Sequence, residues 1–108
     1  MMTTLVVLLR AGSSARLIYQ LGRAYAKYND FRSAFIQYQN AADQGYVLAE
    51  YNLGVLYEKG WGVGKDEGRA VAWYRRAAEQ GFVLAQFNLR NMLRNGQGVC
   101  CESPTMPP

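Results

Sequence analysis

The sequence predicts an all-α protein, an α/α solenoid (superhelix) of about two and a half helix–turn–helix repeats. Residues 41–63 and 77–99 align at an offset of 36 residues, with 12 of 23 positions identical. Within each stretch apolar side chains recur at three- and four-residue spacing, and glycines follow where that spacing stops. A unit of this length is one supersecondary element that buries its apolar face against its neighbours, as in a solenoid.

The first unit, about residues 15–40, is a divergent copy of the second. Leu21-Gly22 occupies the place of Leu53-Gly54, which predicts a matching first helix. The turn that follows is four residues shorter than that of the second unit and lacks Gly-x-Gly-Val. Asn29 lies in this turn, and asparagine tolerates the left-handed backbone that a glycine would otherwise supply.

The second unit, about residues 41–76, begins with a helix that ends at a glycine turn. Leu53, Leu56 and Tyr57 fall at i, i+3 and i+4, which places them on one helical face. Gly60 and Gly62 follow, and both can take the positive φ that ends a helix.

A second helix follows this turn and continues to Gly81. Asp66 is suited to the N-cap, and Glu67 places negative charge in the first turn. Trp73 and Tyr74 could serve as a stacking platform for bases or sugars. Because they occupy helix-packing positions of the repeat, we favour a core role for them.

The third unit, about residues 77–99, repeats the first helix and the glycine turn but has no second helix before the tail. Arg90 stands where the other units have glycine, and it would prevent the close approach of a paired helix. The helix has apolar residues with no following helix to cover them, namely Leu84, Leu89, Met92 and Leu93. Exposed apolar area marks interfaces. The sequence therefore suggests self-association with a second copy, or a place in a longer array.

The two ends differ in composition from the repeats. Residues 1–14 form an apolar extension that is too short for a membrane span and lacks the basic start of an export signal. Residues 100–108 are expected to be a disordered tail, in which the redox state of Cys100 and Cys101 stays open. We favour a cytoplasmic location, and secretion or a periplasmic location is the alternative if the extension is a truncated signal.

Composition excludes several function classes. The chain has no histidine, which removes Ser-His and Cys-His nucleophile pairs and histidine-ligated metal. Twelve Lys and Arg against eight Asp and Glu give a net charge of +4, but these basic residues are scattered. That scatter disfavours nucleic-acid binding. We therefore expect no enzyme activity, no metal and no other cofactor.

The loop within residues 52–66 raises one enzymatic alternative, because its glycines and Lys65 suggest a phosphate-binding loop. Such a loop needs a preceding strand and a Ser or Thr after the lysine. Here a helix precedes the glycines and Asp66 follows the lysine. The third unit repeats Gly-x-Gly-Val at residues 96–99 without a lysine, so we interpret the loop as a helix-to-helix turn.

The stretch from Ala49 to Gly81 resembles a Sel-one-like repeat, the longer relative of the tetratricopeptide repeat. It carries Leu-Gly-x-x-Tyr, then Gly-x-Gly-Val-x-x-Asp, then Ala-x-x-Trp-Tyr-x-x-Ala-Ala. The resemblance covers residues 15–99. It implies a superhelix whose first helices line the concave side, and work as an adaptor or scaffold.

These inferences predict a non-catalytic module that binds a peptide or partner protein through the concave face, with an acidic partner as one candidate. The candidate residues of that face follow from helical spacing: Arg16, Tyr19, Arg23, Lys27, Tyr51, Val55, Glu58, Lys59, Phe87, Asn91 and Arg94. The recurring aromatic residues among them could instead pack between neighbouring repeats. The alternative function is a small secreted hydrolase or cell-wall-binding protein, as in β-lactamase-like members of the same family.

Overall fold

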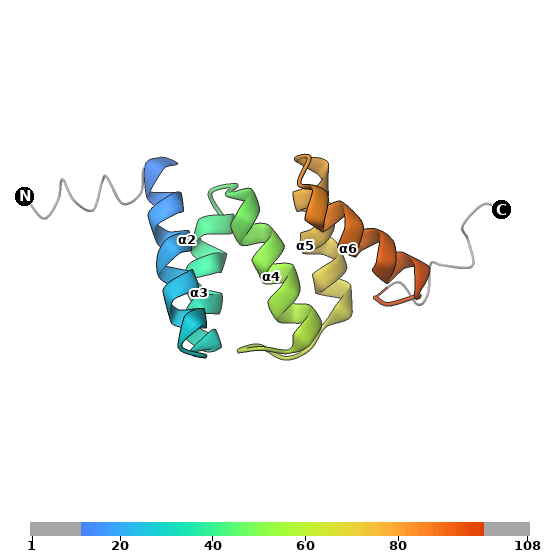
Figure 1. The fold of residues 1–108 in the computed structure, drawn as a ribbon, viewed down its shortest axis with the longest axis horizontal. Coiled ribbons are helices and arrows are strands. Elements are labelled where there is room, and N and C mark those ends of the chain that lie inside the picture. Colours follow the sequence, from blue (N-terminus) through green and yellow to red (C-terminus); the bar gives the residue numbers. More distant parts are fainter. Residues whose placement is uncertain (1–11, 99–108) are drawn as a thin grey trace, which may run out of the picture.

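Five α-helices follow one another in the part of the chain that the computed structural model describes, residues 12–98, and this part contains no strand. The helices are α2 (Gly12–Lys27), α3 (Phe31–Ala42), α4 (Val47–Lys59), α5 (Glu67–Glu79) and α6 (Val83–Arg94). Figure 1 shows them in chain order along the long axis, with α2/α3 and α4/α5 as antiparallel pairs. The all-α repeat architecture is therefore confirmed. Most of the predicted N-terminal extension and the predicted disordered tail lie outside the described residues.

The turns within the helix pairs have the backbone that the sequence predicts. Asn29 links α2 to α3 at φ 64°, and Gly60 ends α4 at φ 73°. The Asp66 side chain caps α5 by accepting a hydrogen bond from the Arg69 backbone N–H at 3.0 Å. Asp30 caps α3 in the same way. The glycine loop connects helix α4 to helix α5, as expected for a structural turn.

Within the described part of the chain the core contains two clusters, one at each junction between units. The first joins α3 to α4 and contains Ala34, Tyr38, Ala41, Ala42, Ala49, Leu53 and Leu56. The second joins α4, α5 and α6 and contains Tyr57, Ala70, Val71, Tyr74 and Met92. Trp73 packs against both clusters. The alanines bring the helices close together, and the tyrosines fill the remaining space.

The Leu-Gly glycines leave room for a tyrosine ring of the paired helix. A Cβ added to Gly54 would lie 2.6 Å from the ring of Tyr74, and one added to Gly22 would lie 2.7 Å from the ring of Tyr38. Real Cβ atoms do not approach a ring so closely, so each tyrosine occupies space that only glycine leaves free. This contact sets the spacing of both helix pairs.

Each Gly-x-Gly loop packs against the preceding unit of the array. Gly62 has a φ of 74° and lies directly on the backbone of Phe31, at the start of α3. Gly98 has the same φ and lies on the backbone of Glu67, at the start of α5. At both sites a side chain would meet backbone atoms, so the two glycines have equivalent structural roles.

The residue between the two glycines makes a side-chain contact across the same boundary. Trp61 stacks on Phe31 with ring centroids 5.0 Å apart. At the next boundary, Gln97 Nε2 donates a hydrogen bond to Glu67 Oε2 at 2.7 Å. An aromatic stack at one junction is therefore replaced by a polar pair at the other.

No helix within residues 12–98 combines the length and the apolar character needed to cross a bilayer.

Candidate interaction surface

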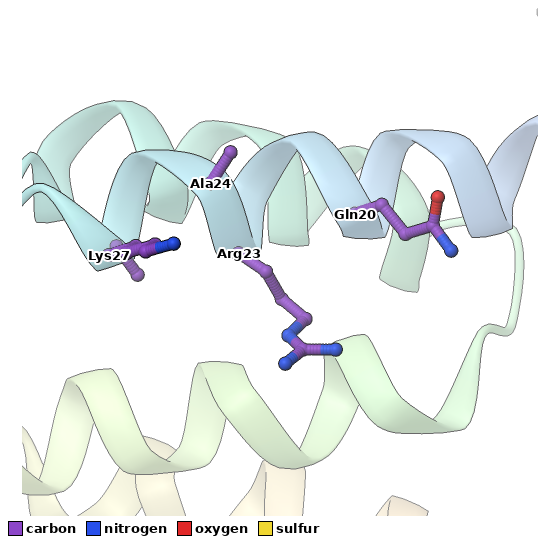
Figure 2. A pocket seen from close by; sticks show the side chains of 5 residues that line it. Gln20, Arg23, Ala24 and Lys27 are labelled. Atoms are coloured by element: carbon purple, nitrogen blue, oxygen red, sulfur yellow. The ribbon is translucent and has the colours of Figure 1, made fainter.

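Among the hollows formed by residues 12–98, three that lie on or between the first helices of the units, α2, α4 and α6, bear on the candidate surface. The one beside α2 has a volume of about 570 Å³ and is lined by Gln20, Arg23, Ala24, Ala26 and Lys27. Figure 2 shows that Arg23 extends from α2 toward α4. Both cations of this hollow are exposed, so the hollow is basic.

A second hollow, the α4–α6 groove, is mostly polar. Its volume is about 330 Å³, and it is lined by Tyr51, Val55, Glu58, Lys59, Tyr74, Asn88, Asn91, Met92, Asn95 and Gln97. The groove gathers five predicted residues from two helices, and these are Tyr51, Val55, Glu58, Lys59 and Asn91. The structure therefore brings together a candidate set that the sequence could only assign to separate helices.

Several polar side chains of the α4–α6 groove are held by neighbours. The Tyr74 hydroxyl donates to Glu58 Oε1 at 2.7 Å, and Asn88 Nδ2 donates to the Tyr51 hydroxyl at 3.2 Å. No hydrogen bond or ion pair within the described residues holds the side chains of Lys59 and Asn91. These two are therefore available to a ligand.

Tyr74 at the floor of the groove is fixed as a hydrogen-bond donor. Burial raises the pKa of its hydroxyl, and the hydrogen bond to the Glu58 carboxylate raises it further. The phenol consequently stays protonated at neutral pH. Its proton orients the Glu58 carboxylate, so the negative charge of the groove has a defined position.

The third hollow lies at the equivalent place between the first two units and is mainly apolar. Its volume is about 170 Å³, and it is lined by Ala26, Phe31, Tyr38, Asn52, Val55, Leu56 and Trp61. The positions that differ account for the contrast. Trp61 corresponds to Gln97, and Ala26 corresponds to Glu58.

The predicted aromatic residues divide into two packed side chains and one exposed one. Tyr19 is half-buried against Tyr46, with ring centroids 5.2 Å apart. Tyr51 makes the equivalent contact with Phe82 at 5.1 Å. Both tyrosines therefore pack between repeats, which is the alternative that the sequence left open. Phe87, at the equivalent position of α6, is 56% exposed.

The predicted charged residues and the amide Asn91 are mostly exposed. The exposed ones are Arg16, Arg23, Lys27, Lys59 and Arg94. Glu58 and Asn91 are half-buried. Arg16 and Arg94 line none of the three hollows, whereas the other predicted cations do.

Sequence reasoning missed five lining residues of the groove, namely Tyr74, Asn88, Met92, Asn95 and Gln97. Asn88 had a signal, since the pair Asn-Leu recurs in the second and third units. Sequence reasoning also missed Glu50, which is 1% exposed in the core of the second helix pair. Its carboxylate accepts a hydrogen bond from Gln80 and lies 3.5 Å from the Arg76 guanidinium.

The comparison with protein families decides which repeat this is. The Sel1 repeat model matches residues 9–46 and again residues 47–82, which together span more than half of the chain. The chain belongs to the Sel1 repeat family. The two matches each contain one helix pair, α2/α3 and α4/α5.

Solved structures agree with this assignment to the Sel1 repeat family. A Sel1 repeat protein from Oxalobacter formigenes superposes with a TM-score of 0.73 at 34% identity, over 82% of this chain and 37% of that one. A protective antigen of uropathogenic Escherichia coli strains, described as displaying an SLR fold, gives a TM-score of 0.76 at 36% identity. That match covers 79% of this chain and 19% of the antigen.

Among curated proteins, the chain is similar to DAP3-binding cell death enhancer 1 of Rattus norvegicus, with 43% identity over 51 residues. The Mus musculus protein of the same name is 41% identical over 51 residues. Each match covers 47% of this chain and 10% of the relative, so the similarity concerns a small part of those proteins.

Proposed function

We propose that this Sel1 repeat chain is a non-catalytic interaction module that binds a peptide or a short segment of a partner protein. The binding surface is the side of α2, α4 and α6 that carries the α4–α6 groove and the basic hollow beside α2. One observation carries the proposal: equivalent positions of the three first helices line hollows on this side. Arg23, Val55 and Asn91 form one such row.

A second row of equivalent positions indicates the charge of the partner. Lys27, Lys59 and Asn95 lie one helical turn further along α2, α4 and α6, and all three line hollows. Both lysines and Arg23 are exposed. Glu58 is the one acid in the lining of the α4–α6 groove, and one of its carboxylate oxygens accepts the hydrogen bond from the Tyr74 hydroxyl. The surface therefore favours a ligand with acidic side chains.

The polar lining of the α4–α6 groove suits the main chain of a peptide. The carboxamide of Asn91 can donate and accept hydrogen bonds, as the peptide group requires. Tyr51 and Met92 add apolar surface beside it. A volume of about 330 Å³ accommodates a few residues of an extended segment rather than a folded domain.

The absence of catalysis is part of the proposal. The whole sequence contains no histidine, and the described residues contain no group of three His, Cys, Asp or Glu positioned to hold a metal. The groove carboxylate Glu58 is a hydrogen-bond acceptor for a tyrosine with a raised pKa. That hydrogen bond orients the carboxylate, and the sequence has no histidine to serve as a general base.

Charge reversal on the proposed surface provides the test. The chain is immobilised as wild type and as Arg23→Glu plus Lys59→Glu, and captured proteins are quantified by mass spectrometry. The matched control is Arg32→Glu plus Arg75→Glu, which makes the same change in net charge at exposed positions of α3 and α5.

We expect the first variant to lose, by about tenfold or more, partners that the control retains, since two favourable charge contacts become repulsive. Equal capture by the wild type and both variants would reject the surface. Equal loss in both variants would also reject it, because only net charge would then matter.

A further inference from the structure

Helix α6 exposes positions that are buried in α4. Tyr57 of α4 is 8% exposed, whereas Leu93, at the same place in α6, is 39% exposed. Glu50 is 1% exposed, and its counterpart Gln86 is exposed. Helix α5 covers these positions on α4. On α6, helix α5 reaches them through the hydrogen bond that Gln86 Nε2 donates to the Ala78 carbonyl oxygen at 3.2 Å, and no helix within the described residues follows α6 to cover them. The open face of α6 consists of Gln86, Arg90 and Leu93, with Val83, Phe87 and Arg94 beside them, and all six are exposed.

The centre of the open face differs from α4 in shape. Gly54 admits the Tyr74 ring to within 2.6 Å of the place where a Cβ would be. Arg90 replaces that glycine, so a helix with a tyrosine at the matching position cannot approach as α5 does. A helix with a small residue there avoids the clash.

The charges of the open face are also reversed relative to the α4/α5 pair. In that pair the acid Glu50 belongs to the first helix, and the base Arg76 belongs to the second. On α6 the acid is replaced by the neutral Gln86, and a cation, Arg90, lies one turn away. Arg94 adds a second cation, so the covering helix should supply acidic side chains.

We propose that the open face of α6 binds an amphipathic helix of a partner protein, which packs on α6 as α5 packs on α4. This helix has a small residue opposite Arg90 and an acidic residue within reach of it. Apolar side chains of the helix cover Leu93 and Phe87, which together with Val83 form an exposed apolar patch around the arginines. A second copy of this chain fits less well, because a symmetric contact would place the same arginines close together.

Helix α5 itself supplies the probe for the test. Two labelled peptides of residues 66–82 are made, both with Tyr74→Ala to remove the clash with Arg90. One keeps Arg76 and the other carries Arg76→Glu. Binding of each peptide to the full chain is measured by fluorescence anisotropy, for the wild type and for Arg90→Glu. Since Arg90 is exposed, this substitution should leave the fold intact.

We expect the wild type to bind the Arg76→Glu peptide about fivefold more tightly or better, as for one partly desolvated ion pair. Arg90→Glu should reverse that order. Equal affinity for both peptides, or no binding of either up to about 1 mM, would overturn the proposal.

Two further measurements separate this surface from its alternatives. Lys59→Glu changes the α4–α6 groove and should leave peptide binding unchanged, so a loss of binding there would overturn the assignment to α6. In sedimentation the wild type should form no dimer that depends on Arg90, so the wild type and Arg90→Glu should sediment alike. A dimer that depends on Arg90 would show that a second copy covers the face, and would overturn the proposal as well. Failure of this proposal leaves the capture test of the groove unaffected.

Discussion

The hollow at the junction between the first two units is small and mainly apolar, whereas the hollow at the junction between the second and third is larger and mostly polar. Trp61 stacks on Phe31 at the first, and Gln97 hydrogen-bonds to Glu67 at the second. The hollows at the two junctions have volumes of about 170 Å³ and 330 Å³. Yet Gly62 and Gly98 have the same φ of 74°, and they pack on the backbone of equivalent residues, Phe31 and Glu67.

This difference shows that different residues set the packing geometry of a junction and its polarity. The glycines fix how one unit lies on the next, because at these sites any side chain would meet backbone atoms. The residue between them is free to change from aromatic to amide, provided that its partner across the junction changes too. Repeats can therefore carry different surfaces on a common scaffold.

The largest expected effect is at the glycine of the first junction. Gly62→Ala should lower the free energy of unfolding by about 3 kcal/mol, because a positive φ and a clash with Phe31 add together. The measurement is urea unfolding followed by circular dichroism. Gly45→Ala is the matched control, since Gly45 has a φ of 83° but nothing within 4 Å of an added Cβ. It should cost about 1 kcal/mol, and an equal cost at both sites would contradict the packing role.

A smaller effect is expected from the side chains at the two junctions. Trp61→Ala should cost about 2 kcal/mol, because a stacked ring that is 44% exposed is lost. Gln97→Ala should cost about 1 kcal/mol or less, as for one hydrogen bond.

Transplanting the polar pair sharpens this comparison. Phe31→Glu combined with Trp61→Gln should be more stable than the sum of the single changes predicts, with a coupling of about 0.5 kcal/mol or more. Strict additivity would show that the two positions do not act as a pair.

The tyrosine hydroxyls that face the two junctions should contribute less still. Tyr51→Phe should lower stability by about 0.5–1 kcal/mol, since Asn88 loses its acceptor. Tyr19→Phe should cost less than Tyr51→Phe, because the contact from Asn52 is 3.5 Å long. Thermal unfolding of both variants in parallel checks the order, and a larger cost at Tyr19 would contradict it.

The smallest effect on stability at any one pH is expected from replacing Glu50. Across pH, however, the replacement should give a distinct trend in stability. Burial raises its pKa, against the smaller lowering effects of Arg76 of α5 and of Gln80, which follows α5 directly. Between the ordinary pKa and the raised one, the unfolded chain ionises before the folded one, so stability falls as pH rises through this window.

Glu50→Gln removes this loss, and α6 already has glutamine at the equivalent position, Gln86. The melting temperature of the variant relative to the wild type should therefore increase from pH 4 to pH 7. Parallel pH profiles would show that Arg76 compensates fully for the burial of Glu50.

The helix pairs and their turns could be predicted because local chemistry decides them. An aspartate such as Asp66 caps the helix that follows it by bonding to a nearby backbone N–H. Asn29 and Gly60 permit a left-handed backbone that most residues resist. The candidate surface was only partly predictable. Helical spacing assigned Tyr51 and Asn91 to one face of each helix, but it could not show that the two residues line one groove.

The order of the helices, the glycine turns and the row of equivalent positions along α2, α4 and α6 follow from the sequence by itself, since they depend on neighbours a few residues away. The tertiary structure alone decided which polar groups are buried and which are free. Glu50 and Glu58 look alike in the sequence, but one is enclosed by α5 and the other lies at the edge of a groove. The reason is physical: exposure depends on how one unit lies on the next, and contacts between distant residues determine that arrangement.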